Sequence, residues 1–233
     1  MRTVRKAAKQ PEFLKEWKVR FRNNKGRSAK YADLDRLPEY DALKDTLMRE
    51  QYYLCCYCCN QVDQNSAHIE HFITQSNKAK GADIQLDYHN LLASCNGYFQ
   101  GFSTVGRESC GHWKDDYANK NRLYSLEEII SPLDSECEQA FMFLPNGEMH
   151  PLPDNNVRAN NTIAKIGLNT YALSKAREAA INVAYEEVGL SSGQPDQIDA
   201  NKLQEELRYY TSPSKEGKLP AFCDAVSYLL RQL

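Results

Sequence analysis

The sequence has 233 residues, of which 42% are hydrophobic, and 29 Lys and Arg against 31 Asp and Glu give a formal charge of −2. This length can bury a core without disulfides. It offers no run of about 18 apolar residues for a transmembrane helix, and no apolar stretch follows the basic first residues as a signal peptide requires. We therefore exclude secreted, membrane-spanning and wholly disordered classes, and expect a cytoplasmic protein without a membrane partner.

Positive charge is concentrated in the first thirty residues. They hold eleven Lys and Arg against two acidic residues, a net +9, so the rest of the chain carries −11. Phe13, Trp17 and Phe21 recur every four residues, which predicts an amphipathic helix with one docked face. We expect residues 1–37 to form a basic arm that can bind phosphate or an acidic partner. The candidate nucleic-acid contacts in it are Arg5 and Lys6, and a solvated basic helix is the alternative.

Short elements are predicted after the arm. Pro38 predicts the start of a helix that runs to about residue 53. Residues 62–73 look extended around a polar turn and predict a short hairpin, followed by a loop over 74–88. Residues 90–95 (NLLASC) predict the start of a short helix, and the glycine-containing stretch 96–109 predicts an inserted loop.

The last part of the chain, residues 125–233, is predicted to be a hairpin followed by helices. Asn146-Gly147 is a strong turn signal within 140–150. Asn169 is a plausible N-cap for the next helix. The predicted helices are 171–188, 199–210 and 220–232. No chemistry is visible in this part, so we interpret it as a scaffold or a partner-binding surface.

The eight cysteines are the most informative residues, because clustered cysteines without a secretion signal are typical of metal or redox sites. Two overlapping pairs in the hexapeptide 55–60 have Cys-x2-Cys spacing, and the residues alone leave their register open. These pairs are Cys55 with Cys58 and Cys56 with Cys59. A second pair, Cys95 and Cys110, completes a candidate four-cysteine zinc site. A redox dithiol or spare buried thiols are the alternatives, and Cys137 and Cys223 are expected to be buried structural residues.

Three further potential ligands fall within four positions, His68, Glu70 and His71. On a strand, His68 and Glu70 share one face and His71 lies on the other. Carboxylate oxygen suits a hard cation such as Mg²⁺, and imidazole can act as a base near neutral pH. One site can use all three only if the strand ends or bends near Glu70. Exposed polar residues on a hairpin are the alternative.

The order of these motifs along the chain resembles the HNH (ββα-metal) endonucleases. It runs Cys-x2-Cys, Glu-His, Asn-Leu, Cys and then Cys-Gly-His-Trp-Lys. The resemblance implies an α+β fold, in which residues 38–124 form a small zinc-braced ββα-metal core embedded in a mainly helical chain. The Cys-x-Tyr-Cys form of the family's zinc knuckle favours Cys55 and Cys58, together with Cys95 and Cys110.

The resemblance also implies the catalytic roles. His71 would be the general base and Glu70 a ligand of catalytic Mg²⁺ or Mn²⁺, so that both side chains converge on one cation. Asn90 would be the family's middle Asn. The last metal ligand often lies directly after the final cysteine, where this chain has glycine. His112 is then the favoured ligand and Asn96 its rival.

Two further features follow from the same comparison. Lys114 occupies the family's Lys position and is a candidate phosphate contact. His68 would orient the metal site or have no catalytic role.

The flanking segments resemble one group within this family. Residues 1–6 with Pro11, residues 50–55 and residues 167–169 resemble HNH proteins encoded beside ABC-type ATPases in Septu-type anti-phage operons and in some retrons. This implies an endonuclease that cleaves DNA or RNA in anti-phage defence with an ATPase partner. A non-catalytic zinc-containing nucleic-acid or protein adaptor is the alternative. A Cys-x2-Cys redox protein is disfavoured, because the expected βαβ pattern is missing.

Overall fold

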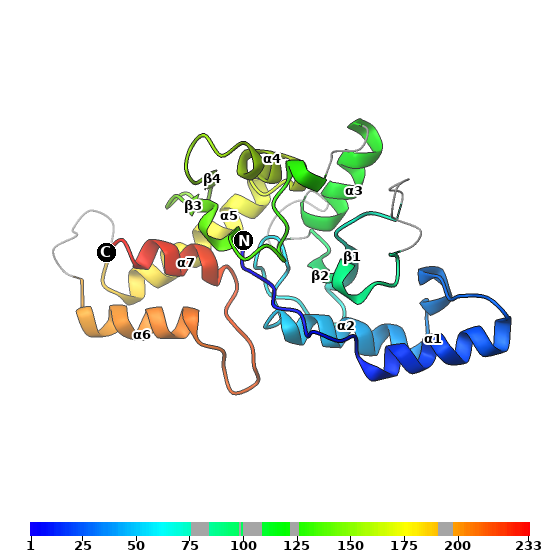
Figure 1. Cartoon of the computed structure of the whole chain (residues 1–233). Coiled ribbons are helices and arrows are strands. Elements are labelled where there is room, and N and C mark those ends of the chain that lie inside the picture. The colour runs from blue at the N-terminus through cyan, green and yellow to red at the C-terminus, as the bar shows by residue number, and fades with distance from the viewer. Residues whose placement is uncertain (76–83, 98, 100–108, 122–125, 191–197) are drawn as a thin grey trace.

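The computed structural model describes residues 1–75, 84–97, 99, 109–121, 126–190 and 198–233. Over these residues the fold is α+β, with helices around two separate two-stranded antiparallel sheets. Helices α1 and α2 lie along one side, β1 and β2 lie between α2 and α3, and α5, α6 and α7 gather at the other end (Figure 1). Short 3-10 turns connect these elements: η1 (Tyr31–Leu34), η2 (Tyr88–Asn90), η3 (Leu126–Glu128) and η4 (Cys137–Gln139). No helix among the described residues is long and apolar enough to span a bilayer.

The two N-terminal helices match their predictions. Helix α1 (Glu12–Lys25) buries Leu14 and Trp17, and Phe13 and Phe21 pack partly buried against the core. Helix α2 (Pro38–Glu50) has Pro in its first turn, as predicted, and ends about three residues early. Gln51 accounts for this end, because its buried side-chain amide donates to the carbonyl oxygens of Leu54 and Ala93, both at 2.8 Å. The amide therefore joins the end of α2 to the sheet.

The first sheet differs from the sequence-based prediction. Strand β1 (Ala67–His71) pairs antiparallel with β2 (Leu91–Cys95), with His71 opposite Leu91. The hairpin predicted over 62–73 is wrong, because the polar turn only leads into β1 and the partner strand lies twenty residues away. The short helix predicted at 90–95 is also wrong. All five residues of β2 are buried, and a short apolar run of this kind fits a buried strand as well as a helix.

Helix α3 (Cys110–Asn121) follows β2 and packs on β2 and on α4 (Val157–Ile166). The indole N–H of Trp113 donates to the carbonyl oxygen of Ala164 at 3.1 Å. A Cβ at Gly167 would lie 2.7 Å from the Trp113 ring, and the φ angle of Gly167 is +65°. Glycine at this position therefore permits α3 and α4 to approach. Helix α4 was not expected from the sequence.

The C-terminal elements largely match their predictions. The second sheet is the expected hairpin of β3 (Phe141–Phe143) and β4 (Met149–Pro151). The helices are α5 (Tyr171–Glu187), α6 (Ala200–Thr211) and α7 (Cys223–Leu230). Asn169 does not cap α5, which is a correction: Thr170 precedes that helix, and the Asn169 amide instead bonds both main-chain groups of Met149 at 2.8 Å.

Contacts join the three segments that the sequence suggests. The Val4 amide donates to the carbonyl oxygen of Pro132, and the Phe222 amide donates to that of Cys59, each at 2.7 Å. The domain boundaries therefore remain a prediction about how one connected core is organised. They are 1–37, 38–124 and 125–233.

Candidate metal centre and active site

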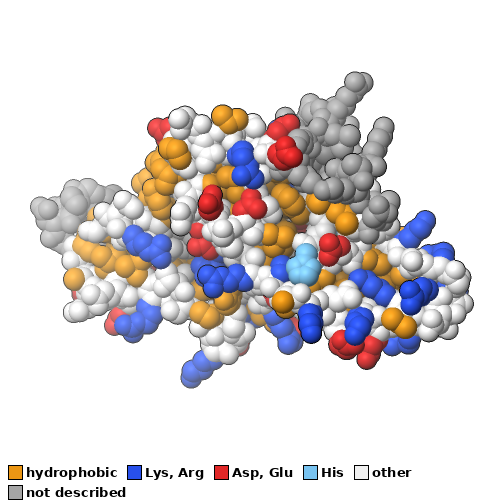
Figure 2. Space-filling view, viewed as in Figure 1, with side chains coloured by type: hydrophobic (Ala, Val, Ile, Leu, Met, Phe, Trp, Pro, Cys, Tyr) orange, Lys and Arg blue, Asp and Glu red, His pale blue; other side chains and the backbone are white. Residues whose placement is uncertain are grey.

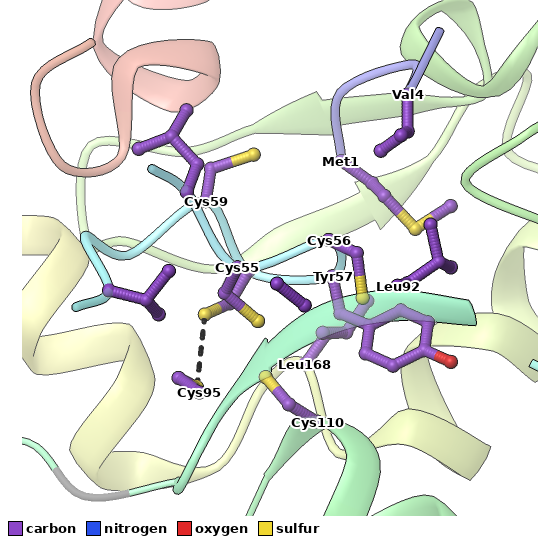
Figure 3. Packing of buried hydrophobic residues seen from close by; sticks show 14 of the residues in the cluster. Met1, Val4, Cys55, Cys56, Tyr57, Cys59, Leu92, Cys95, Cys110 and Leu168 are labelled. Carbon is purple, nitrogen blue, oxygen red and sulfur yellow. Dashed lines mark hydrogen bonds between the residues drawn. The ribbon is translucent and has the colours of Figure 1, made fainter. Parts of the chain in front are cut away.

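Four cysteines converge where the 55–59 turn meets the end of β2 and the start of α3. The sulfurs of Cys55, Cys58, Cys95 and Cys110 all lie within 4.8 Å of one another, and Cys58 Sγ is 3.8 Å from Cys95 Sγ. Zinc ligands at about 2.3 Å in a tetrahedron lie about 3.8 Å apart. Cys59 points away from this group (Figure 3). The structure therefore confirms the Cys55 and Cys58 register.

The chemistry of the four sulfurs fits a zinc ion. Burial raises the pKa of Cys58 and Cys110 well above the usual range. Burial also acts to raise the pKa of Cys55. Hydrogen bonds from the neighbouring thiols, of which the one from Cys110 has the largest effect, outweigh burial and lower that pKa. A divalent cation is the partner that lets several buried thiolates coexist. Cys137 and Cys223 are buried elsewhere, as expected.

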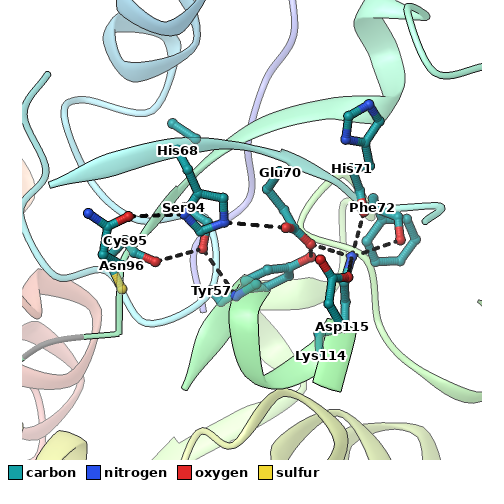
Figure 4. A network of polar contacts seen from close by, with 12 residues as sticks. Tyr57, His68, Glu70, His71, Phe72, Ser94, Cys95, Asn96, Lys114 and Asp115 are labelled. Carbon is teal, nitrogen blue, oxygen red and sulfur yellow. Dashed lines mark hydrogen bonds and ion pairs between the residues drawn. The ribbon is translucent and has the colours of Figure 1, made fainter. Parts of the chain in front are cut away.

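Glu70 is a buried carboxylate whose two oxygens have different surroundings. Oε1 accepts a hydrogen bond from the Tyr57 hydroxyl at 2.9 Å and forms an ion pair with Lys114. Oε2 faces His68 Nε2 at 3.6 Å (Figure 4). Burial alone would raise the pKa of Glu70, but the Lys114 ammonium and His68 outweigh it and lower the pKa to about 2. One oxygen is therefore fixed by the protein, and the other is directed toward His68.

Lys114 is fully buried, so the prediction that it contacts nucleic acid is wrong for this structure. Besides Glu70, its ammonium donates to the main-chain oxygens of His71 at 2.5 Å and Phe72 at 3.2 Å. These acceptors use all three of its hydrogens. Lys114 thus holds the Glu70 carboxylate and the end of β1 together. Tyr57, the second group on Oε1, was missed, although it is the Tyr of the Cys-x-Tyr-Cys knuckle.

His71 lies on the opposite face of β1 from Glu70. Its Nε2 lies 2.9 Å from the carbonyl oxygen of Gln85, and its ring meets the Tyr31 ring edge-on at 4.5 Å between centroids. The two side chains point apart (Figure 4), so the expectation that both face one cation is wrong. Strand alternation is the reason, because β1 stays extended through His71. Burial lowers the pKa of His71.

Asn90 secures the segment that follows His71. Its Oδ1 accepts from the Ile73 amide at 2.7 Å, and its Nδ2 donates to the Ile73 carbonyl oxygen at 3.0 Å. Asn90 itself is buried. Its contacts are those of a residue that positions the end of β1.

The remaining candidate ligands surround the first turn of α3. The His112 ring lies 4.3 Å from the His68 ring, between centroids. Asn96 Oδ1 is 3.4 Å from His68 Nδ1, so Asn96 supports His68 instead of facing Glu70. Within the described ranges, the cysteines alone bring three or more candidate ligand atoms within 4.8 Å of one another. His68, Glu70 and His112 are therefore adjacent but not drawn together to coordination distances.

The basic arm lies beside the His71 face. The Tyr31 amide donates to Gln85 Oε1 at 2.9 Å, and Lys18 Nζ donates to the Leu86 carbonyl oxygen at 2.7 Å. Basic side chains gather at the end of the molecule where α1 lies (Figure 2). Arg5 is exposed. The Lys6 side chain is only 4% exposed and pairs with Glu50 at 3.0 Å, so the prediction that Lys6 contacts nucleic acid is wrong here.

Comparison with known proteins agrees with the sequence resemblance. No protein-family model matches the chain. The chain is 29% identical over 143 residues to "Retron Ec83 putative HNH endonuclease" from Escherichia coli. The match covers 57% of this chain and 54% of that protein, so the chain spans about half the length of this relative. The similarity confirms the resemblance to HNH endonucleases in a retron-associated setting.

Proposed function

We propose that this protein is a metal-dependent HNH endonuclease that hydrolyses phosphodiester bonds of nucleic acid. The observation that carries the proposal is the buried Glu70 carboxylate, whose Oε1 is fixed by Tyr57 and Lys114 and whose Oε2 is directed toward His68. It lies in a β1–β2–α3 arrangement whose strand and helix ends meet at the four-cysteine cluster. This is the arrangement that the HNH resemblance implies.

His71 is the general base of the proposed reaction. Its Nε2–H donates to the Gln85 carbonyl oxygen at 2.9 Å, which orients the ring and leaves the lone pair on Nδ1. Nδ1 takes a proton from the water that attacks phosphorus, and such a transfer contributes roughly 10²–10⁴-fold. Asn90 keeps the segment after His71 in place through both main-chain groups of Ile73.

Glu70 and His112 are the residues that would hold Mg²⁺ or Mn²⁺. When bound, such an ion supplies positive charge that stabilises the phosphoryl group and the leaving 3′ oxygen. Because Glu70 and His71 leave β1 on opposite faces, the scissile phosphodiester must lie across the end of that strand. Lys114 supports this end through the His71 and Phe72 carbonyl oxygens.

Zinc has a structural role in this proposal. Two five-residue strands and one helix bury little apolar surface by themselves, so metal binding at the cysteines supplies folding free energy. The cluster joins Cys55 and Cys58 to the ends of β2 and α3, which are the elements that flank Glu70.

The substrate is DNA or RNA, and the basic arm including Arg5 adds salt-sensitive attraction to phosphate. We place the protein in the cytoplasm as the effector of an anti-phage defence system with an ABC-type ATPase partner. The retron setting of the relative supports a defence role. The charge of −11 outside the first thirty residues supports recruitment by another protein, since it opposes unaided binding to nucleic acid.

The test is cleavage of plasmid DNA and of RNA with Mg²⁺ or Mn²⁺, with and without the ATPase partner. His71→Ala should lower the rate by at least roughly 10²-fold and leave the zinc content and circular dichroism unchanged. His150→Ala, in the other sheet, is the matched control and should cut like wild type. Equal cutting by wild type and His71→Ala would remove His71 from the mechanism. Binding of nucleic acid without cleavage by any form would favour the adaptor alternative.

A further inference from the structure

Gly111 leaves space that no other residue could leave at the start of α3. A Cβ built at this position would lie 2.4 Å from Glu70 Oε2 and 2.7 Å from His68 Nε2. Both distances are shorter than Cβ contacts in proteins allow. The absence of a side chain at 111 therefore lets the Glu70 carboxylate and the His68 imidazole occupy the region in front of the helix.

The hydrogen bonds around His68 determine which of its nitrogens carries the proton. Asn96 Nδ2 donates to the carbonyl oxygen of Asn65 at 3.2 Å, which turns Asn96 Oδ1 toward His68. This oxygen can only accept, so the contact with His68 Nδ1 at 3.4 Å requires Nδ1 to be the donor. In the neutral ring, Nε2 then carries the lone pair.

In the neutral ring, His68 Nε2 and Glu70 Oε2 are therefore two acceptors that face each other, whereas a protonated ring pairs with the carboxylate. Their separation of 3.6 Å is too long for a hydrogen bond. Residues 68 and 70 lie on one face of β1, so both atoms are directed at the space beside Gly111. A lone pair on imidazole and a carboxylate oxygen that face one space are the donors that a divalent cation uses.

The support behind His68 is typical of a metal ligand. Histidines that bind metals donate their second ring N–H to an oxygen acceptor, which fixes the ring and its tautomer. Asn96 provides that acceptor for His68. Tyr57 and Lys114 do the equivalent for Glu70 by holding Oε1. Each of the two groups thus has one side held by the protein and one side directed at the same space.

We propose that His68 is a direct ligand of the catalytic divalent ion, together with Glu70. In this chain His68 of β1 supplies the metal ligand that Gly111, at the start of α3, cannot supply. The existence of the ion rests on the proposed function. The inference adds His68 to Glu70 and His112 as a ligand of that ion. The His112 ring, 4.3 Å from that of His68, borders the same space.

The experiment is titration of the zinc-loaded full chain with Mn²⁺, followed by calorimetry and EPR, without nucleic acid. Wild type should bind one Mn²⁺ besides its zinc. His68→Ala and His68→Gln should each weaken that binding at least about tenfold and reduce the imidazole nitrogen signal in the pulsed EPR spectrum. His89→Ala, which removes an exposed histidine, is the control and should bind like wild type. Zinc content and circular dichroism establish that each variant is folded.

Substitution of Gly111 is the second arm of the experiment. Gly111→Asn should lose Mn²⁺ binding, because its Cβ would collide with His68 and Glu70. In His68→Ala/Gly111→Asn the collision with Glu70 Oε2 remains, so this variant should bind Mn²⁺ no better than Gly111→Asn. The inference is overturned if Glu70→Gln abolishes Mn²⁺ binding while both His68 variants bind like wild type. Wild type that binds no Mn²⁺, or binding unaffected by Glu70→Gln, overturns the proposed catalytic ion as well.

Discussion

The buried pair of Lys114 and Glu70 gives the sharpest prediction about stability. Lys114→Met removes the ammonium that pairs with a carboxylate whose side chain is 2% exposed, and it leaves the carbonyl oxygens of His71 and Phe72 without that donor. Breaking a buried ion pair by removing one partner costs roughly 3–5 kcal/mol. Glu70→Gln/Lys114→Met removes both charges, so its cost should fall below the sum of the single costs by roughly 1–3 kcal/mol.

Denaturant unfolding of the zinc-loaded chain, followed by tryptophan fluorescence, measures these free energies. Arg20→Met is the control, because Arg20 pairs with Glu39 at 2.6 Å with 60% of its side chain exposed. Such a surface pair contributes at most about 1 kcal/mol. A cost for Lys114→Met no larger than that of Arg20→Met would refute the buried pair and the account of how Glu70 is held.

Three further predictions concern the zinc site and the segment after β1. Cys58→Ser should release the zinc, measured by mass spectrometry, and lower the melting temperature. Cys59→Ser, one residue away and outside the cluster, is the control and should keep one zinc. Retained zinc in Cys58→Ser would contradict the assignment of Cys55 and Cys58 as ligands. Removal of zinc from the wild type by a chelator should unfold the region around the cysteines, measured as faster amide hydrogen exchange in β2. Asn90→Ala should cost roughly 1–3 kcal/mol, since it removes two partly buried hydrogen bonds to the main chain of Ile73. It should also slow cleavage, and unchanged stability and rate would remove its positioning role.

Helices with clear start and stop signals could be predicted from the sequence, whereas the first sheet could not. Pro38 and the Asn146-Gly147 turn act over a few residues, and the helix and hairpin they predict are present. The pairing of β1 with β2 depends on contacts across twenty residues. The five buried residues of β2 have no alternation that separates a strand from a helix. Tertiary packing decides their structure.

The candidate site was predictable in its residues but not in its geometry. Spacing alone left two registers for the cysteines, and the family resemblance favoured the one that the structure has. The roles of Lys114 and Lys6 depend on burial, which charge patterning does not reveal. The sequence alone shows that Gly111 occupies the position where the family often has its last metal ligand. Its relation to His68 emerges only when β1 and α3 are placed against each other.

Chemical rescue of a His71 variant tests the central claim most directly. His71→Gly removes the proposed base and leaves a space of the size of an imidazole. The account predicts that this variant does not cut nucleic acid with Mg²⁺ or Mn²⁺, and that added imidazole restores cleavage in proportion to its concentration, with 5′-phosphate and 3′-hydroxyl products. Cleavage by His71→Gly at the wild-type rate without imidazole would contradict it.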